Sequence, residues 1–194
     1  MIRKLGQEVR KHFDLQMKER LPQFVRYTAP SPEPGLRLYR WEFADDLFFF
    51  VALCRSIHTE AFTVEIASTS RPHWEPHGMV AGPTNEPRNG FVHFRLNDLL
   101  GQETRQWDLW WDFGPPTDLG TSADADPAAR LDTFLKYVFF DSDAAREAFV
   151  ACALPLVPSA VSEAIDYVVK YANPYFEGVA QRYGGPDMRK QPTA

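Results

Sequence analysis

The stretch that decides the fold reads LRLYRWEFADDLFFFVALCRSIHTEAFTVEIAST and spans residues 36–69. Apolar and polar side chains alternate through much of it, which is the period of a β-strand. Turn residues interrupt the pattern at 44–46 and again between Arg55 and Glu60. The stretch therefore predicts three antiparallel strands joined by two turns.

The register of these strands follows from the first turn. If residues 45–46 form a two-residue hairpin loop, Trp41 opposes Phe50. Extending the pairing brings Cys54 opposite Phe62. One face of the sheet then becomes wholly apolar, as a face that receives helices must be. Its members are Tyr39, Trp41, Phe43, Phe48, Phe50, Ala52, Cys54, Phe62, Val64 and Ile66.

Helical patterns flank these strands. Residues 2–20 carry apolar side chains three and four positions apart with charges between them, which predicts an amphipathic helix. Two further strands are expected at 91–96 and 107–113. In the C-terminal half, capping residues predict helices that begin at 126, 141–143 and 159, the last ending before Asn173-Pro174.

These patterns define one fold class. We predict an α+β protein in which an antiparallel sheet of about five strands carries an N-terminal helix and a C-terminal helical layer. A single domain over residues 1–183 accounts for the pattern, and residues 184–194 are expected to be a flexible tail.

Composition narrows the class of partner. The 194 residues carry a formal net charge of -5, which disfavours nucleic acid and anionic membranes and favours a basic protein. Cys54 and Cys152 are expected to be small buried side chains in a reducing compartment. Charged residues interrupt the N-terminal segment, so the apolar core of a signal peptide is not expected there. The longest apolar run, 47–54, is too short to span a bilayer. We therefore expect a cytoplasmic protein.

The reverse face of the central strands is the first candidate binding surface. The same register places Phe49, Val51 and Leu53 there, bordered by Arg40, Arg55 and Glu65. An apolar floor with a few charges at its rim is how ligand pockets are lined. The C-terminal helices could equally cover this strip. If it is open, His58 or His93 could supply proton transfer.

Trp110 marks the second candidate surface. Strand alternation places Asp108, Trp110 and Asp112 on one face and sends Trp107 and Trp111 to the other. An aromatic anchor between two carboxylates suits Arg or Lys from a protein partner and disfavours nucleic acid. The alternative is that Trp110 is covered by other elements and belongs to the core.

The string His73-Trp74-Glu75-Pro76-His77 is the most enzyme-like in the chain. Two imidazoles and a carboxylate are possible zinc ligands, but Pro76 opposes a helix and no third ligand is near in sequence. The string favours a loop anchored by Trp74 over a metal site. No catalytic residue, metal or cofactor is predicted, because no nucleophile elbow, phosphate loop or dinucleotide fingerprint occurs.

Three segments also carry a resemblance to a known family: RLYRW at 37–41, FTVEI at 62–66 and WDLWW at 107–111. Their layout over residues 1–113 resembles bacterial domains of unknown function in the group numbered 4304. The chain departs from that group at 49–52, where FFVA replaces a strand containing glutamine. The resemblance implies a binder, namely an immunity protein that neutralises a toxin, and carries over no catalytic residue.

The charge, the candidate surfaces and the resemblance together lead to one expected function and one alternative. We expect a cytoplasmic protein-interaction domain, of the immunity-protein kind, that binds a basic protein through an acidic and aromatic surface. The alternative is a small-molecule-binding protein or enzyme that uses a polar pocket on the sheet face at Arg40, Arg55 and Glu65.

Overall fold

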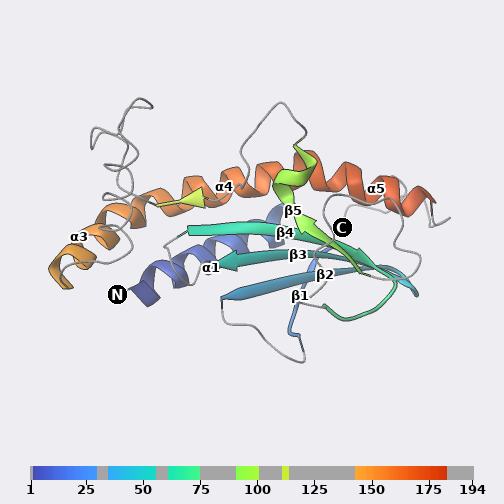
Figure 1. Ribbon diagram of the computed structural model, residues 1–194, viewed down its shortest axis with the longest axis horizontal. Coiled ribbons are helices and arrows are strands. Elements are labelled where there is room, and N and C mark those ends of the chain that lie inside the picture. Colours follow the sequence, from blue (N-terminus) through green and yellow to red (C-terminus); the bar gives the residue numbers. More distant parts are fainter. Residues whose placement is uncertain are drawn as a thin grey trace, which may run out of the picture.

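The computed structural model describes residues 2–29, 35–55, 61–74, 91–100, 111–113 and 143–182. These residues form two layers, an antiparallel sheet and a set of helices that cover one of its faces (Figure 1). The N-terminal helix, the antiparallel sheet and the C-terminal helices confirm the predicted α+β class. The helix predicted from residue 126, the tail at 184–194 and His58 lie outside the described residues.

The sheet is built from neighbouring strands of the chain. Its order is β1 (Val25–Tyr27), β2 (Leu36–Ala44), β3 (Leu47–Arg55), β4 (Ala61–Thr69) and β5 (Phe91–Arg95), each antiparallel to the next. A two-residue strand, β6 (Trp111–Asp112), pairs with β4 at Ala61 and Phe62. The short edge strand β1 was not predicted from the sequence.

The predicted register of β3 is wrong by one residue. Trp41 opposes Phe49 rather than Phe50, and Phe62 opposes Arg55 rather than Cys54. The predicted turn is nevertheless correct, because Ala44 and Leu47 pair around the two-residue loop. The register shifts between Glu42 and Ala44, as a β-bulge at the residue between them would cause. The shift turns every β3 side chain to the opposite face.

The core lies between the sheet and the helices. Helix α1 (Ile2–Arg20) buries the stripe Leu5, Val9, Phe13 and Met17 against the sheet. From the sheet come alternate residues of β2 and β4, as predicted, together with Phe49, Val51 and Leu53 of β3. Phe49 is fully buried, and its ring centroid lies 4.8 Å from that of Phe176. Each fully buried side chain of this size contributes about 2 to 3 kcal/mol of transfer free energy.

The C-terminal helices form one continuous run. The run comprises α3 (Asp143–Ala153), a 3-10 turn η3 (Leu154–Leu156), α4 (Val157–Tyr167), a π-helical turn η4 (Val168–Ala172) and α5 (Asn173–Arg182). The sequence predicted a helix end before Pro174, and this prediction is wrong. A proline in a helix crowds the carbonyl of the preceding turn, and the π turn directly before Asn173-Pro174 is wider than an α-helical one and gives the ring room.

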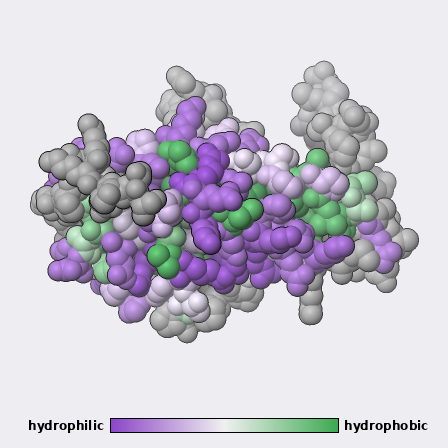
Figure 2. Space-filling model, turned by 180° about the vertical axis from the view of Figure 1, so that it is seen from behind, coloured by the Kyte–Doolittle hydropathy of each residue, from purple (hydrophilic) through white to green (hydrophobic). Residues whose placement is uncertain are grey.

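The run from Phe149 to Arg182 is, among the described residues, the one helix long and apolar enough to cross a membrane by length and composition. Its apolar side chains, including Val161, Ile165 and Phe176, pack in the core. Because a core helix passes the same test, this property alone does not indicate a membrane protein. Seen from behind, the described surface is mainly hydrophilic, with a larger hydrophobic area toward the end that carries α3 (Figure 2).

Candidate functional site

The sheet face turned away from the helices carries the polar side chains of interest. Its apolar part is a second, smaller cluster made of Ala29, Leu38, Phe48, Phe50, Ala52, Ala67 and Trp74. Trp74 is buried, and its ring centroid lies 5.8 Å from that of Phe50. Trp74 therefore packs on the sheet, as a residue that anchors its segment would. Arg40 and Glu42 project from the same face of β2 at one side of this cluster.

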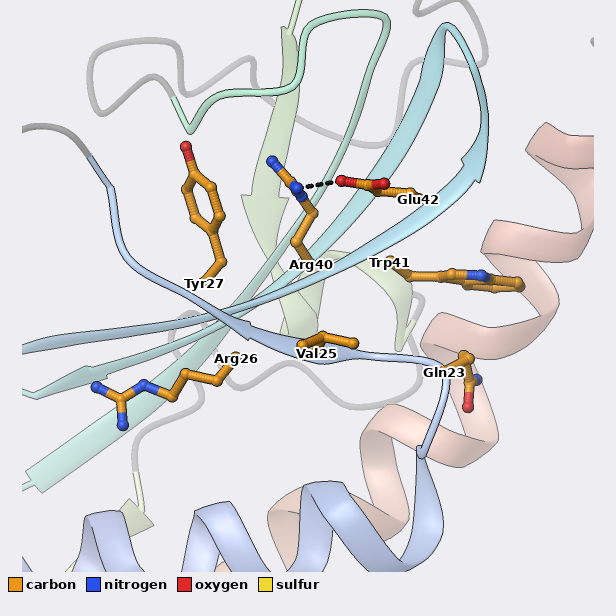
Figure 3. Close-up of a pocket in the computed structure, with 7 residues that line it drawn as sticks. All are labelled: Gln23, Val25, Arg26, Tyr27, Arg40, Trp41 and Glu42. Carbon is orange, nitrogen blue, oxygen red and sulfur yellow. Dashed lines mark hydrogen bonds and ion pairs between the residues drawn. The ribbon is translucent and has the colours of Figure 1, made fainter. Parts of the chain in front are cut away.

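A cavity of about 380 Å³ lies where this face meets the edge strand β1 (Figure 3). It is lined by Gln23, Val25, Arg26, Tyr27, Arg40, Trp41 and Glu42. Tyr27, Arg40 and Glu42 stand on the same side of the two strands, whereas Trp41 points toward the C-terminal helices (Figure 3). Alternation places Tyr27 and Arg40 on one face because they belong to neighbouring antiparallel strands.

Arg40 is held in place from three directions. Its guanidinium is ion-paired with Glu42, and its Nη1 donates to the Pro72 carbonyl oxygen at 2.8 Å. The same group lies over the Tyr27 ring, 4.7 Å from the centroid. Tyr27 in turn shares a 3.0 Å hydrogen bond with Nδ1 of His73. Arg40 is therefore a fixed wall of the cavity, because its charge and planar surface are both engaged.

The outer edge of β1 is the most accessible part of the site. In the described part of the chain, β1 pairs with β2 and with no other strand. Val25 is 68% exposed, the largest exposure among the large apolar side chains described. The Glu42 carboxylate is 60% exposed, and Asp45 and Asp46 in the following turn are also exposed. The edge therefore presents the apolar Val25 beside the half-exposed Arg26, with carboxylates beyond one end of the strand.

Glu65 and His93 form a buried pair on the same face. Nε2 of His93 lies 2.8 Å from Oε2 of Glu65, and the Arg95 guanidinium lies 3.8 Å from the other carboxylate oxygen. Burial alone would raise the pKa of Glu65. Hydrogen bonds from His93 and Cys54 and the charges of His93 and Arg95 outweigh it, so that the pKa is lowered. Trp74 covers His93, with ring centroids 4.6 Å apart.

The predicted strip with its three rim charges does not exist as a surface. Phe49, Val51 and Leu53 face the helices and are fully buried, because the bulge reverses β3. Arg40 and Glu65 do share a face, but Glu65 does not line the cavity. Arg55 lies elsewhere, with its guanidinium packed against Gly6 of α1.

Only part of the second predicted surface, around Trp110, lies among the described residues. Asp108 and Trp110 lie outside the described residues, and so do Glu75 and His77 of the histidine string. Asp112 pairs with Ala61 through the backbone of β6. Trp111 is buried and stacks on Phe62, as expected for its face. No group of three or more His, Cys, Asp or Glu side chains that could hold a metal occurs within the described ranges.

Sequence reasoning missed the residues from β1. Val25 and Tyr27 were not assigned to any strand, because three residues are too few to display an alternating pattern. The signal that could have found them is composition, namely β-branched and aromatic side chains directly after the helix-ending Pro22. Cys54 and Cys152 were expected to be buried; Cys54 is partly exposed beside Glu65, and Cys152 is exposed on α3.

Comparisons with protein-family models, with curated proteins and with solved structures found no match. The resemblance to the group numbered 4304 therefore stays a prediction. The function has to be argued from the cavity, the edge strand and the charges that surround them.

Proposed function

We propose that this chain is a protein-interaction domain that binds an extended segment of a partner protein along the outer edge of β1. The observation that carries the proposal is the 68% exposed Val25 on an edge strand that borders the cavity. An edge strand offers backbone N–H and C=O groups to an incoming strand. Val25 and the cavity beside it offer apolar contact to the partner's side chains.

The charges around the edge specify the partner's chemistry. The donors of Arg40 are directed at Glu42 and at the Pro72 carbonyl. Glu42 keeps free acceptor capacity in an exposed carboxylate, and Asp45 and Asp46 add negative charge in the adjoining turn. A Lys or Arg side chain at this end of the segment complements that charge. The net charge of -5 supports a basic partner as well.

Our finer proposal is that the protein works in the cytoplasm without nucleic acid or membrane, and that its partner is a toxin that it neutralises as an immunity protein. The acidic net charge and the two free thiols support this proposal. So does the resemblance carried by residues 37–41 and 62–66. Asp108, Trp110 and Asp112 remain a proposed second contact with the same partner.

Selection of a random-peptide library on the full chain tests binding at the edge. We expect selected peptides to alternate apolar side chains and to carry a Lys or Arg at one end. Val25→Glu and Glu42→Lys should each weaken binding at least tenfold. Leu15→Glu, at a 48% exposed site on α1, should change it less than twofold. Peptides that bind all three variants as well as the parent would contradict the proposal.

The finer proposal has a separate test in the native organism. The genes beside this one are sequenced, and the adjacent gene is expressed in cells with and without this chain. A toxic basic product whose toxicity this chain relieves is the expected result. A neighbouring product that is harmless, or one whose toxicity is unchanged, counts against an immunity role while leaving binding at the edge to its own test.

Small-molecule binding in the cavity is the second candidate function. A volume of about 380 Å³ lies within the range of ligand pockets, and Arg40 over Tyr27 supplies a charge and an aromatic wall. Here Arg40→Met should abolish binding of a ligand found by screening, whereas Asp46→Lys, in the turn outside the cavity lining, should leave it intact. Binding that survives Arg40→Met but is weakened by Asp46→Lys would instead identify the peptide edge as the site in use.

A further inference from the structure

Four arginines from four elements gather at the other side of β1, toward α1. Gly6, Arg10 and Asp14 follow one another at intervals of four and so form one stripe of the helix. Opposite this stripe lie Arg26 of β1, Arg37 of β2 and Arg55 of β3. Together they form the arginine cluster, which consists of Arg10, Arg26, Arg37 and Arg55.

Asp14 is the acidic partner of one end of the cluster. Its two carboxylate oxygens accept hydrogen bonds from Arg37, one from Nε at 2.6 Å and one from Nη2. Tyr39 also donates its hydroxyl to Asp14. Arg26 stands farther off, with its Nη1 3.9 Å from the carboxylate. One carboxylate therefore serves two guanidiniums, and its lone pairs are largely used by Arg37 and Tyr39.

Arg10 is the member of the cluster whose Nη groups are not engaged by the contacts described below. Its Nε donates to the Gly6 carbonyl oxygen at 3.0 Å, and it forms no ion pair with any described residue. Its side chain is partly buried. Burial, followed by the positive charges of Arg55, Arg37 and Arg26, lowers its pKa. Gathering like charges in this way is unfavourable, and a bound anion would offset the repulsion.

We propose that the arginine cluster binds the phosphate group of a small molecule. Guanidinium groups present planar pairs of N–H donors that match tetrahedral oxyanions, and the Nη groups of Arg10 are available for this purpose. Arg26 is half exposed and gives access from solvent. Arg55 has interactions of its own and contributes its charge.

The charge of the whole chain selects a small ligand over a polymer. With a net charge of -5, the protein repels a nucleic acid backbone or an anionic bilayer at long range. Four guanidiniums along one helix stripe, with Asp14 beside only Arg26 and Arg37, still attract a single dianion at short range, within a Debye length of about 10 Å. A sulfate group shares the chemistry of phosphate, so the test includes both anions.

Titration of the full chain with inorganic phosphate, followed by the NMR resonances of the arginine Nε–Hε groups, tests the proposal. Ionic strength is held constant with sodium chloride, and sulfate and acetate titrations run in parallel. We expect the Arg10 and Arg37 resonances to shift and saturate with phosphate. Sulfate should give the same pattern more weakly, and acetate should not saturate the site.

Two variants and one control decide the outcome. Arg10→Gln should weaken phosphate binding at least tenfold, and Arg26→Gln, at an exposed position that tolerates change, at least threefold. Lys11→Gln removes the same charge at the neighbouring, exposed position of α1 and should change binding less than twofold. Shifts that chloride alone reproduces, or that persist unchanged in Arg10→Gln and Arg26→Gln, would overturn the proposal. Glu42→Gln, on the sheet face turned away from α1, should leave phosphate binding intact, which separates this site from the peptide edge.

Discussion

Glu65 and His93, on the adjacent strands β4 and β5, are joined by a 2.8 Å contact between Oε2 and Nε2 beneath the indole of Trp74. The Glu65 side chain is 13% exposed and the His93 side chain 4%. Burial of both side chains restricts their contact with an outside substrate, and the Trp74 ring packs on that of His93.

Glu65→Gln should destabilise the fold by about 2 kcal/mol at neutral pH, because it removes the charged partner of a buried pair. The folded-state pKa of Glu65 is lower than its ordinary value of 4.5. Its contribution is therefore fully present above about pH 4.5 and is lost as the pH falls through the lowered pKa. Denaturant unfolding of both proteins between pH 7 and pH 3 measures the difference. A difference in unfolding free energy that does not change with pH would show that the ionised Glu65 carboxylate is not its source.

Asp14→Asn should cost about 2 kcal/mol, because the half-buried Arg37 loses its bidentate partner and Tyr39 loses its acceptor. Glu8→Gln on the same helix is the matched control. Its partner Lys11 is largely exposed, so the change should stay within about 0.5 kcal/mol. Urea unfolding at low ionic strength compares the two variants. Equal losses would show that the Asp14 contacts stabilise the fold no more than the exposed Glu8–Lys11 pair does.

Gly178→Ala should stabilise the protein by about 0.5 to 1 kcal/mol, since alanine favours helix and nothing lies near the added methyl group in α5. The same change at Gly6 in α1 should gain little. There the new Cβ overlaps the Arg55 guanidinium, which must shift. Thermal unfolding of both variants tests this contrast, and a larger gain at Gly6 than at Gly178 is the contrary result.

Phe49→Ala should cost about 3 to 5 kcal/mol, because the ring is fully buried among Trp41, Phe43 and Phe176. Phe48→Ala should cost about 1 kcal/mol less, since Phe48 belongs to the smaller cluster on the other face. Chemical denaturation gives both values. A loss at Phe48 larger than at Phe49 would indicate that β3 faces the other way.

The bulge at Phe43 shows why register was harder to predict than strand positions. Residues 47–53 are apolar without interruption and are buried on both faces. Burial therefore does not distinguish the two registers, as it does for β2 and β4, where polar side chains alternate. A bulge leaves no composition signal at this site, and the one-residue shift moved Phe49, Val51 and Leu53 into the core.

The candidate site was predictable only in part, for a related reason. The sequence correctly predicted that Arg40 lies on a polar face of the sheet, because the alternation of side chains within β2 defines that face. Val25 and Tyr27 complete the cavity from a strand too short to be recognised. Arg55 was grouped with Arg40, but its side chain follows the reversed face of β3 to Gly6.

The sequence by itself determined the elements whose signals are local. The stripe of α1, the strands between 36 and 69 and the turn at 45–46 follow from the spacing of neighbouring residues. Only the tertiary structure decided which side chains share a surface, as with Glu65 and His93, or with Arg10 and Arg37. Those pairs are joined by strand register and helix docking, which depend on the packing of the whole core rather than on any short segment.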